Sequence, residues 1–252
     1  MNNNKLKIIQ VIHNTYKDRA YEFFKQKKNS NLSEEGKWKE MIYCILAGTQ
    51  VPVEIARRAQ LAILEYKDGN GYIWNIDRLS NKSEEDFKQL EKILRNAGYR
   101  YPKTKAKCIM NAAEFFVKNY NGSINEFLAS QPDAKLLRST LIRNIKGIGI
   151  KIATHWLRNI GYPLGTIDIH VKRLLEWTGL VELENWPNTM TDKLFIFLER
   201  KIEDLARDAR LEVNILQYEL WLYGRNFCSK NKCKECRAKN FCMKGRKNVL
   251  IK

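Results

Sequence analysis

Long apolar runs are missing from this chain of 252 residues, and prolines are few. No segment approaches the ~18 consecutive apolar residues that cross a bilayer, so we expect no membrane span. The first residues, MNNNKLKIIQVIHNTYKD, hold only a short apolar run and no small-residue cleavage site, so we expect no signal peptide. These absences predict an intracellular protein, in the cytoplasm or nucleoid.

Alternating strand patterns are equally scarce, and only five prolines interrupt the helical periodicity. Apolar residues recur at helical spacing along most of the chain, as in KWKEMIYCILA (37–47). The chain is therefore predicted to be all-α with short loops. The predicted helices cover residues 5–27, 37–47, 52–66, 84–97, 104–119, 124–129, 134–145, 150–160, 169–178, 190–205 and 211–223.

Acidic residues do not balance the basic ones. The chain has 28 Asp and Glu against 45 Lys and Arg, which gives a net charge of +17. A basic excess of this size points to nucleic acid as a partner. A lysine-rich proteome, such as that of a thermophile, would leave the same excess, so composition alone does not decide.

The segment KGIGIKIATHW (146–156) places two glycines just ahead of a predicted helix. With the preceding helix it would form a helix-hairpin-helix. Glycines allow positive φ, and free N–H groups at a helix start bind anions such as a DNA phosphate. The residues that would meet the phosphate are Lys146, Gly147 and Gly149. An ordinary connection between two helices is the alternative.

Lys151 and Asp168 are the candidate reactive residues. Lys151 lies at the start of the second hairpin helix, where the helix dipole disfavours a cation. Asp168, in TIDIH (166–170), is placed to cap the next helix. In one interpretation, Lys151 is merely tolerated at the helix start and Asp168 is only a helix cap. In the other, Lys151 is an amine that lies beside the fixed carboxylate of Asp168, near a bound phosphate.

The stretch LIRNIKGIGIKIATHWLRNIGYPLGTIDIHVKRLL (141–175) resembles the helix-hairpin-helix, Gly/Pro-rich loop and Asp signature of base-excision DNA glycosylases. Upstream, WKEMIYCILAGTQ and NAGYRYPKTKAKCIMNAAEFF resemble further segments of that family. The resemblance implies a helical domain at 35–160 that ends in the hairpin, and a second domain built from 1–34 and 161–252. It also implies a monomer that binds double-stranded DNA with a damaged base or abasic site.

A lysine at the position of Lys151 marks the family members that release the base and then nick the strand. The resemblance implies that its neutral amine attacks the sugar C1′, expels the base as a Schiff base forms, and nicks 3′ to the site by β-elimination. Burial and a helix start both favour the neutral amine. Asp168 is implied to stabilise positive charge on the sugar.

The segments HWLRNIGY and GYRYPKTKAK and the final lysine resemble the second class of 8-oxoguanine DNA glycosylases. We therefore predict 8-oxoguanine opposite cytosine as the substrate, which the enzyme must flip out of the helix. Removal of oxidised pyrimidines, in the manner of endonuclease III, is the first alternative. A non-catalytic DNA-binding protein that uses the hairpin only for phosphate is the second.

The same resemblance assigns the residues that grip the flipped base. It matches Trp221 with a tryptophan that sandwiches the purine, Lys252 with a terminal lysine near the pocket, and Gln50 with a gap-filling glutamine. His155, one helical turn from Lys151, could line the pocket. Core packing of Trp221 and His155, and a plain helix-end position for Gln50, are the alternatives.

Four of the six cysteines crowd into CSKNKCKECRAKNFC (228–242), with the spacing C-x4-C-x2-C-x5-C. In a reducing compartment this spacing predicts a metal site, and four thiolates suit zinc or an iron–sulfur cluster. The resemblance to endonuclease III favours a [4Fe–4S] cluster over zinc. The ligands would be Cys228, Cys233, Cys236 and Cys242. The second 8-oxoguanine class usually lacks this segment, so the chain combines features of both. Cys44 and Cys108 are predicted to be buried core thiols.

Overall fold

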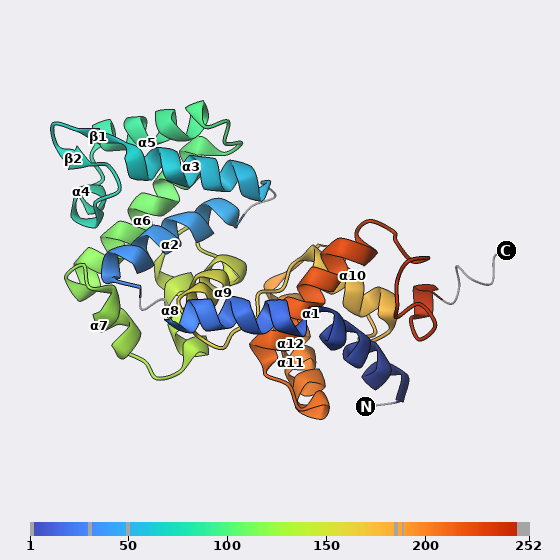
Figure 1. Cartoon of the computed structure of the whole chain (residues 1–252). Helices are drawn as coiled ribbons and strands as arrows, with labels where there is room; N and C mark the ends of the chain where they lie inside the picture. Colours follow the sequence, from blue (N-terminus) through green and yellow to red (C-terminus); the bar gives the residue numbers. More distant parts are fainter. Residues whose placement is uncertain (1–2, 30–31, 49–50, 184–185, 188, 246–252) are drawn as a thin grey trace. The chain divides into compact units, whose positions relative to one another are not determined.

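The computed structural model describes residues 3–29, 32–48, 51–183, 186–187 and 189–245, and helices dominate it (Figure 1). This confirms the all-α prediction. The chain divides into two compact units, Ser30–Tyr162 and a second unit made of Met1–Asn29 and Pro163–Lys252. Within the described ranges, no helix is long and apolar enough to cross a bilayer.

The unit Ser30–Tyr162 is contiguous in sequence and consists of helices α2 to α9 with one small hairpin. Several helices begin at a serine or aspartate that caps them, for example Ser83 at α5 and Asp133 at α8. The elements are α2 (Glu34–Ala47), α3 (Val53–Glu65), β1 (Lys67–Asp68), β2 (Gly71–Tyr72), α4 (Ile76–Ser80), α5 (Glu84–Asn96), α6 (Pro102–Tyr120), α7 (Ile124–Ala129), α8 (Ala134–Asn144) and α9 (Ile150–Asn159).

The core of this unit is an aromatic cluster around Trp156 of α9. Its ring lies 6.0 Å from Phe116 and 6.2 Å from Phe127, and the side chain is fully buried. The indole N–H donates to the Lys37 carbonyl at 2.9 Å, so the buried ring also satisfies its polar atom. These contacts fix α9 against α2 and α6, which in turn fixes the helix start that carries Lys151.

The β1–β2 hairpin and α4 are held together by Arg78. Its guanidinium pairs with Asp68 at 2.8 Å and Asp86 at 2.6 Å, and it also donates to the Gly71 carbonyl at 2.8 Å. These hydrogen bonds to carboxylates raise the pKa of Arg78. This hairpin was not predicted, because two-residue strands cannot show an alternating pattern.

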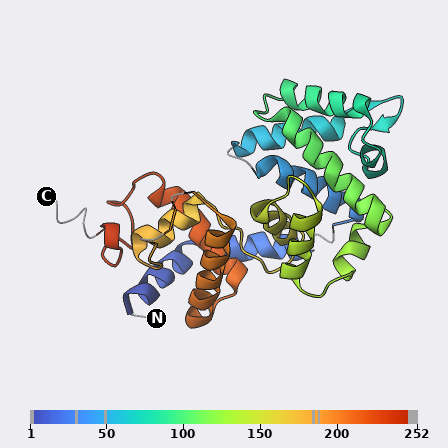
Figure 2. The same cartoon turned by 180° about the vertical axis from the view of Figure 1, so that it is seen from behind.

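The second unit brings the first helix of the chain against the last ones. Its elements are α1 (Asn3–Asn29), α10 (Ile169–Thr178), α11 (Asp192–Ala209), α12 (Val213–Tyr223) and the π-helical turn η1 (Gly224–Cys228). Helix α1 lies beside α12 in both views (Figures 1 and 2), where Phe23 stacks on Tyr218 at 4.5 Å between ring centroids. His13 Nδ1 lies 2.9 Å from the buried carboxylate of Glu219. Helix α12 therefore packs against α1, α10 and α11.

Candidate active site

The two glycines form the predicted turn between α8 and α9. The Ile148 N–H donates to the Ile145 carbonyl at 3.1 Å and closes the turn. Gly147 has φ +104°, and a Cβ there would lie 2.9 Å from Cys108 Sγ. Both the backbone conformation and the close approach of α6 therefore require glycine at 147.

The start of α9 offers backbone N–H groups to an anion. Gly149 is the N-cap residue, and no side chain caps the helix. A Cβ at Gly149 would meet nothing within 4 Å, so the space in front of this helix start is open. Lys146 is exposed beside it, and its carbonyl accepts a 2.9 Å hydrogen bond from Asn111 of α6. Free N–H groups at a helix start form an anion site.

Lys151 is the second residue of α9 and is half-buried. His155 follows one turn later and is also half-buried. The His155 ring meets the ring of Tyr43 edge-on at 5.9 Å, and the Arg57 guanidinium covers Tyr43 at 3.8 Å. Burial raises the pKa of the Tyr43 hydroxyl, so Tyr43 is a neutral donor at physiological pH. His155 thus contacts a buried aromatic side chain on the same side of α9 as Lys151.

Asp168 is the N-cap of α10, as the sequence predicted. Its Oδ1 accepts hydrogen bonds from the backbone N–H groups of His170 at 2.9 Å and Val171 at 3.1 Å. Its Oδ2 accepts a third, from the indole N–H of Trp221 at 3.0 Å. The half-buried carboxylate is therefore held at both oxygens by N–H donors alone, an arrangement that suits an ionised carboxylate.

Trp221 contacts Asp168 from the last turn of α12. Its ring stacks on Tyr218 at 5.7 Å, and the Arg225 guanidinium lies 5.2 Å from its centroid. The resemblance matches Trp221 with a base-sandwiching tryptophan, whereas its hydrogen bond to the aspartate was not predicted. No sequence signal could have revealed it, because 53 positions separate the partners.

A second contact from α12 fixes the loop that leads to Asp168. Gln217 is fully buried and its side-chain amide donates to the Thr166 carbonyl. A Cβ at Gly165 would lie 2.7 Å from Gln217 Cγ, so glycine lets the loop approach the helix this closely. Helix α12 therefore sets the position of Asp168 through both Gln217 and Trp221. This glutamine was not among the predicted site residues.

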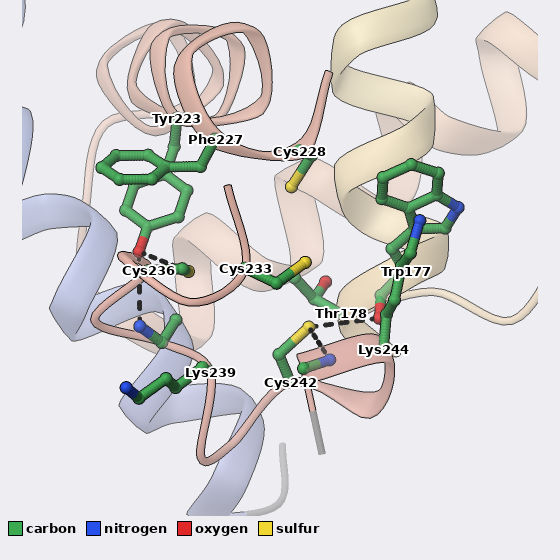
Figure 3. A pocket seen from close by; sticks show the side chains of 12 residues that line it. Trp177, Thr178, Tyr223, Phe227, Cys228, Cys233, Cys236, Lys239, Cys242 and Lys244 are labelled. Atoms are coloured by element: carbon green, nitrogen blue, oxygen red, sulfur yellow. Dashed lines mark hydrogen bonds between the residues drawn. The ribbon is translucent and has the colours of Figure 1, made fainter. Parts of the chain in front are cut away.

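The four clustered cysteines line one pocket with about 390 Å³ of empty space, part of it open solvent (Figure 3). Figure 3 shows the sulfurs of Cys228, Cys233 and Cys242 facing this space. The fourth, Cys236 Sγ, lies 3.1 Å from the Tyr223 hydroxyl. At the other wall, the Lys244 ammonium lies 3.0 Å from the centroid of the Trp177 ring.

The pocket buries its thiols. Burial raises the pKa of Cys228 to about 12, and neighbouring cysteines add to this shift. Burial also raises the pKa of Cys242, whose sulfur accepts a 3.4 Å hydrogen bond from the Gly245 N–H. Across the described part of the chain, no three His, Cys, Asp or Glu side chains converge closely enough to hold a metal ion. The predicted metal site is therefore not confirmed, although its four residues share one pocket. Cys44 and Cys108 are buried elsewhere, as predicted.

A family model described as 8-oxoguanine DNA glycosylase (Ogg-HhH) matches residues 16–211. The chain belongs to this family. Among curated relatives, the 8-oxoguanine DNA glycosylase/AP lyase of Korarchaeum cryptofilum is 30% identical over 75% of this chain and 80% of that protein. The enzyme of the same name from Methanocaldococcus jannaschii is 31% identical over 81% of this chain and 86% of its own.

Solved structures of the 8-oxoguanine DNA glycosylase family share the fold. The M. jannaschii 8-oxoguanine glycosylase/lyase, crystallised with a 15mer DNA containing 8-oxoguanine, superposes with a TM-score of 0.67 at 27% identity. The match covers 87% of this chain and 97% of that one. The 8-oxoguanine DNA glycosylase of Thermotoga maritima gives a TM-score of 0.65 at 26% identity, over 86% and 94% of the two chains.

The glycosylase family model covers Lys151 and Asp168 and ends before Trp221 and the cysteine segment. Lys151 belongs to the unit Ser30–Tyr162, and Asp168 belongs to the other unit. Two predicted DNA-contacting residues, Gln50 and Lys252, lie outside the described residues.

Proposed function

We propose that this chain is a bifunctional DNA glycosylase and AP lyase that removes 8-oxoguanine from double-stranded DNA and nicks the strand at the resulting site. The observation that carries the proposal is the place of Lys151, an amine in the first turn of α9 directly behind the glycine hairpin. Membership of the 8-oxoguanine DNA glycosylase family and the names of its relatives support the substrate.

Lys151 supplies the nucleophile. The lone pair of its neutral amine forms a bond to C1′ of the damaged nucleotide, while the C1′–N bond breaks and the base leaves with a proton. The ring opens to a Schiff base between Lys151 and the sugar. Loss of a C2′ proton then drives out the 3′ phosphate oxygen by β-elimination, and hydrolysis of the Schiff base frees the lysine.

Asp168 stabilises the positive charge that builds on the sugar as the base departs. Its two oxygens accept three hydrogen bonds, from His170, Val171 and Trp221, so the carboxylate needs little reorganisation during the reaction. Fixed charges aimed at a developing charge are typically among the largest contributions to catalysis. Trp221 then acts through Asp168, in addition to the purine contact that the resemblance implies.

The hairpin holds the DNA backbone. Lys146 is exposed, and the uncapped N–H groups at the start of α9 face open space at Gly149. A phosphate bound there fixes the register of the duplex without reading its sequence. The net charge of +17 adds long-range attraction. His155, Gln50 and Lys252 complete the proposed contacts, to the flipped base and to the gap that it leaves.

We propose further that Cys228, Cys233, Cys236 and Cys242 hold a metal centre, with a [4Fe–4S] cluster favoured over zinc. Their shared pocket, its apolar lining by Phe227 and Tyr223, and the Gly245 N–H bonded to sulfur suit a thiolate-ligated cluster. Bound metal would act structurally, by cross-linking the segment. The exposed side chains of Lys230, Lys232, Lys234 and Arg237 on this segment are then presented to DNA phosphates.

Borohydride trapping on an abasic-site duplex tests the central proposal, because reduction of a Schiff base links protein and DNA covalently. We expect the natural chain to trap, Lys151→Gln to abolish the adduct, and Lys118→Gln, an exposed lysine of α6, to leave it unchanged. An adduct that survives Lys151→Gln would refute the choice of nucleophile. Cleavage of two duplexes, one with 8-oxoguanine opposite cytosine and one with thymine glycol, separates the proposed substrate from an oxidised pyrimidine. A protein that binds both duplexes and cleaves neither would be a non-catalytic DNA-binding protein.

A further inference from the structure

Ser229 joins the cysteine segment to the first turns of α10. It follows Cys228 directly, and its backbone N–H donates to the Gly224 carbonyl at 2.8 Å, which closes the π-helical turn η1. Its Oγ lies 2.5 Å from Nδ1 of His170 and accepts a 2.9 Å hydrogen bond from the guanidinium of Arg173. One hydroxyl therefore bonds two side chains of α10.

The donors and acceptors around this hydroxyl complement one another. A guanidinium can only donate, so the Ser229 oxygen accepts from Arg173. The hydroxyl keeps its own proton, which it can donate to Nδ1 of His170. Hydrogen bonds from a charged donor are stronger than neutral ones, so Arg173 fixes the hydroxyl in place. The three half-buried side chains thus set the orientation of the His170 ring.

The backbone of His170 is packed against the same π-helical turn. Gly224, the first residue of η1, lies so close that an added Cβ would be 2.5 Å from the His170 carbonyl oxygen. The start of η1 therefore contacts the backbone of His170, and the residue after its end contacts the side chain. Turns of this kind are rare and occur frequently at functional sites.

His170 connects this contact to Asp168. Its backbone N–H donates to Asp168 Oδ1 at 2.9 Å, so a shift of His170 moves one of the donors that hold the carboxylate. Trp221 holds the other oxygen from the last turn of α12, the helix that η1 continues. Both carboxylate oxygens thus depend on one stretch of chain, which runs from the last turn of α12 to Ser229.

We propose that Ser229 is a positioning residue for Asp168, which fixes His170 and so keeps the Asp168 carboxylate aimed at the charge that develops on the sugar. The proposal rests on the electrostatic role proposed for Asp168. Misplacement of a preorganised group by about 1 Å is enough to slow a reaction strongly, so the link needs to prevent only a small movement. Ser229 lies beyond residues 16–211, so the match to the glycosylase family model does not assign it this role.

Single-turnover base release from an 8-oxoguanine duplex tests this role. Ser229→Ala removes the hydroxyl, and we expect it to lower the rate constant about three- to tenfold, the effect of one lost hydrogen bond. Ser229→Thr keeps the hydroxyl and should release the base within twofold of the natural rate. The control is Ser80→Ala, which removes a hydroxyl bonded to the Asp77 carbonyl in the other unit and should not alter the rate.

A double-mutant cycle separates positioning of Asp168 from a general structural effect. In the Asp168→Asn background, Ser229→Ala should change the remaining rate by less than twofold, because the charge through which Ser229 acts is gone. Affinity for a duplex with a non-reactive abasic-site analogue should also stay within twofold of the natural value.

Three results would overturn the proposal: a natural rate for Ser229→Ala, an equal loss of rate in both backgrounds, or a loss of duplex affinity in place of rate. Ser229→Thr that is as slow as Ser229→Ala would also overturn it, because the hydroxyl would then be irrelevant. Absence of base release by the natural chain would instead refute the proposed function, and natural release by Asp168→Asn would refute the role of Asp168.

Discussion

The indole N–H of Trp221 donates to Asp168 Oδ2 at 3.0 Å, while the other carboxylate oxygen caps α10. This pair joins a helix start to a helix end across 53 positions of sequence. The aspartate is thus oriented by tertiary structure as well as by its own helix.

Trp221→Phe should slow base release while leaving the fold intact. The variant keeps an aromatic ring on Tyr218 but loses the hydrogen bond to the carboxylate, an interaction worth roughly 1.5–3 kcal/mol, or about 10- to 150-fold in rate if it acts fully in the transition state. Single-turnover kinetics on an 8-oxoguanine duplex measure the effect. Tyr218→Phe, which keeps the same ring stack, is the control and should retain the natural rate.

Asp168→Asn separates the charge of this residue from its capping role. Asparagine caps helices about as well as aspartate, so we expect the melting temperature to change little. Loss of the negative charge should nevertheless lower base release by about 100-fold or more, as for other preorganised electrostatic groups. Asp168→Ala should lose activity and also about 1 kcal/mol of folding stability. An Asp168→Asn variant of natural activity would show that Asp168 is only a cap.

The two hairpin glycines should respond differently to alanine. Gly147→Ala places a Cβ on a residue with positive φ and brings it too close to the sulfur of Cys108. It should therefore lower the free energy of unfolding by about 1–3 kcal/mol. Gly149 has φ −98° and open space where a Cβ would lie, so Gly149→Ala should lower the free energy of unfolding by less than about 1 kcal/mol. Chemical denaturation measures both. A further variant, Gly147→Ala with Cys108→Ala, should recover the part of the loss that comes from the sulfur, while the close contact with the Cβ of residue 108 at 3.2 Å and the backbone strain remain.

Metal content tests the cysteine segment. Anaerobically purified protein should carry iron and acid-labile sulfide and absorb broadly in the visible range. Cys233→Ser should lose most of the iron, whereas Cys108→Ser, which changes a buried thiol of the other unit, should keep it. Protein that contains zinc and no sulfide would refute the iron–sulfur cluster but support a metal site at the four cysteines. Absence of both metals in protein that folds normally would refute the site itself.

Glu219→Gln should stabilise the protein increasingly as pH rises. Burial raises the pKa of Glu219 above its ordinary value of 4.5, and His13 only partly opposes this. A carboxyl whose folded pKa is raised contributes stability at low pH, and this stability is lost as pH increases through the folded pKa. Glutamine keeps the neutral form throughout. The melting-temperature gain of Glu219→Gln should therefore grow from about pH 4.5 upward, while Glu22→Gln, an exposed change on α1, shows no such trend.

The sequence predicted the parts of the fold that depend on local patterns. Each predicted helix exists, because helical periodicity and caps such as Asp168 act within a few residues. The ends were less accurate: the helix predicted at 190–205 extends over Asp192–Ala209, where Arg210 in a left-handed conformation ends it. The small hairpin held by Arg78 was missed, since its two-residue strands show no alternating pattern and its ion pairs with Asp68 and Asp86 leave no sequence signal.

The parts of the candidate site that lie within a local sequence motif could be predicted. The hairpin turn, Lys151 and the capping Asp168 occupy consecutive stretches whose residue types fix their local geometry. The contacts of Trp221 and Gln217 with the Asp168 loop, and the contacts of Cys108 and Asn111 with the hairpin turn, depend on how helices pack. Sequence spacing carries no record of such packing. The family prediction, which combined several local motifs, is confirmed by the family model.

The pairing of α1 with α12 has a consequence for synthesis on the ribosome. The unit Ser30–Tyr162 emerges as one uninterrupted stretch and can acquire its core while translation continues. Helix α1 emerges before that unit, yet the buried residues Ile8, Ile9 and Ile12 belong to a unit that is completed only by the residues from Pro163 onward. Its apolar residues therefore stay uncovered until the residues from Pro163 onward have left the exit tunnel, so α1 reaches its native partners after the unit Ser30–Tyr162 has been synthesised.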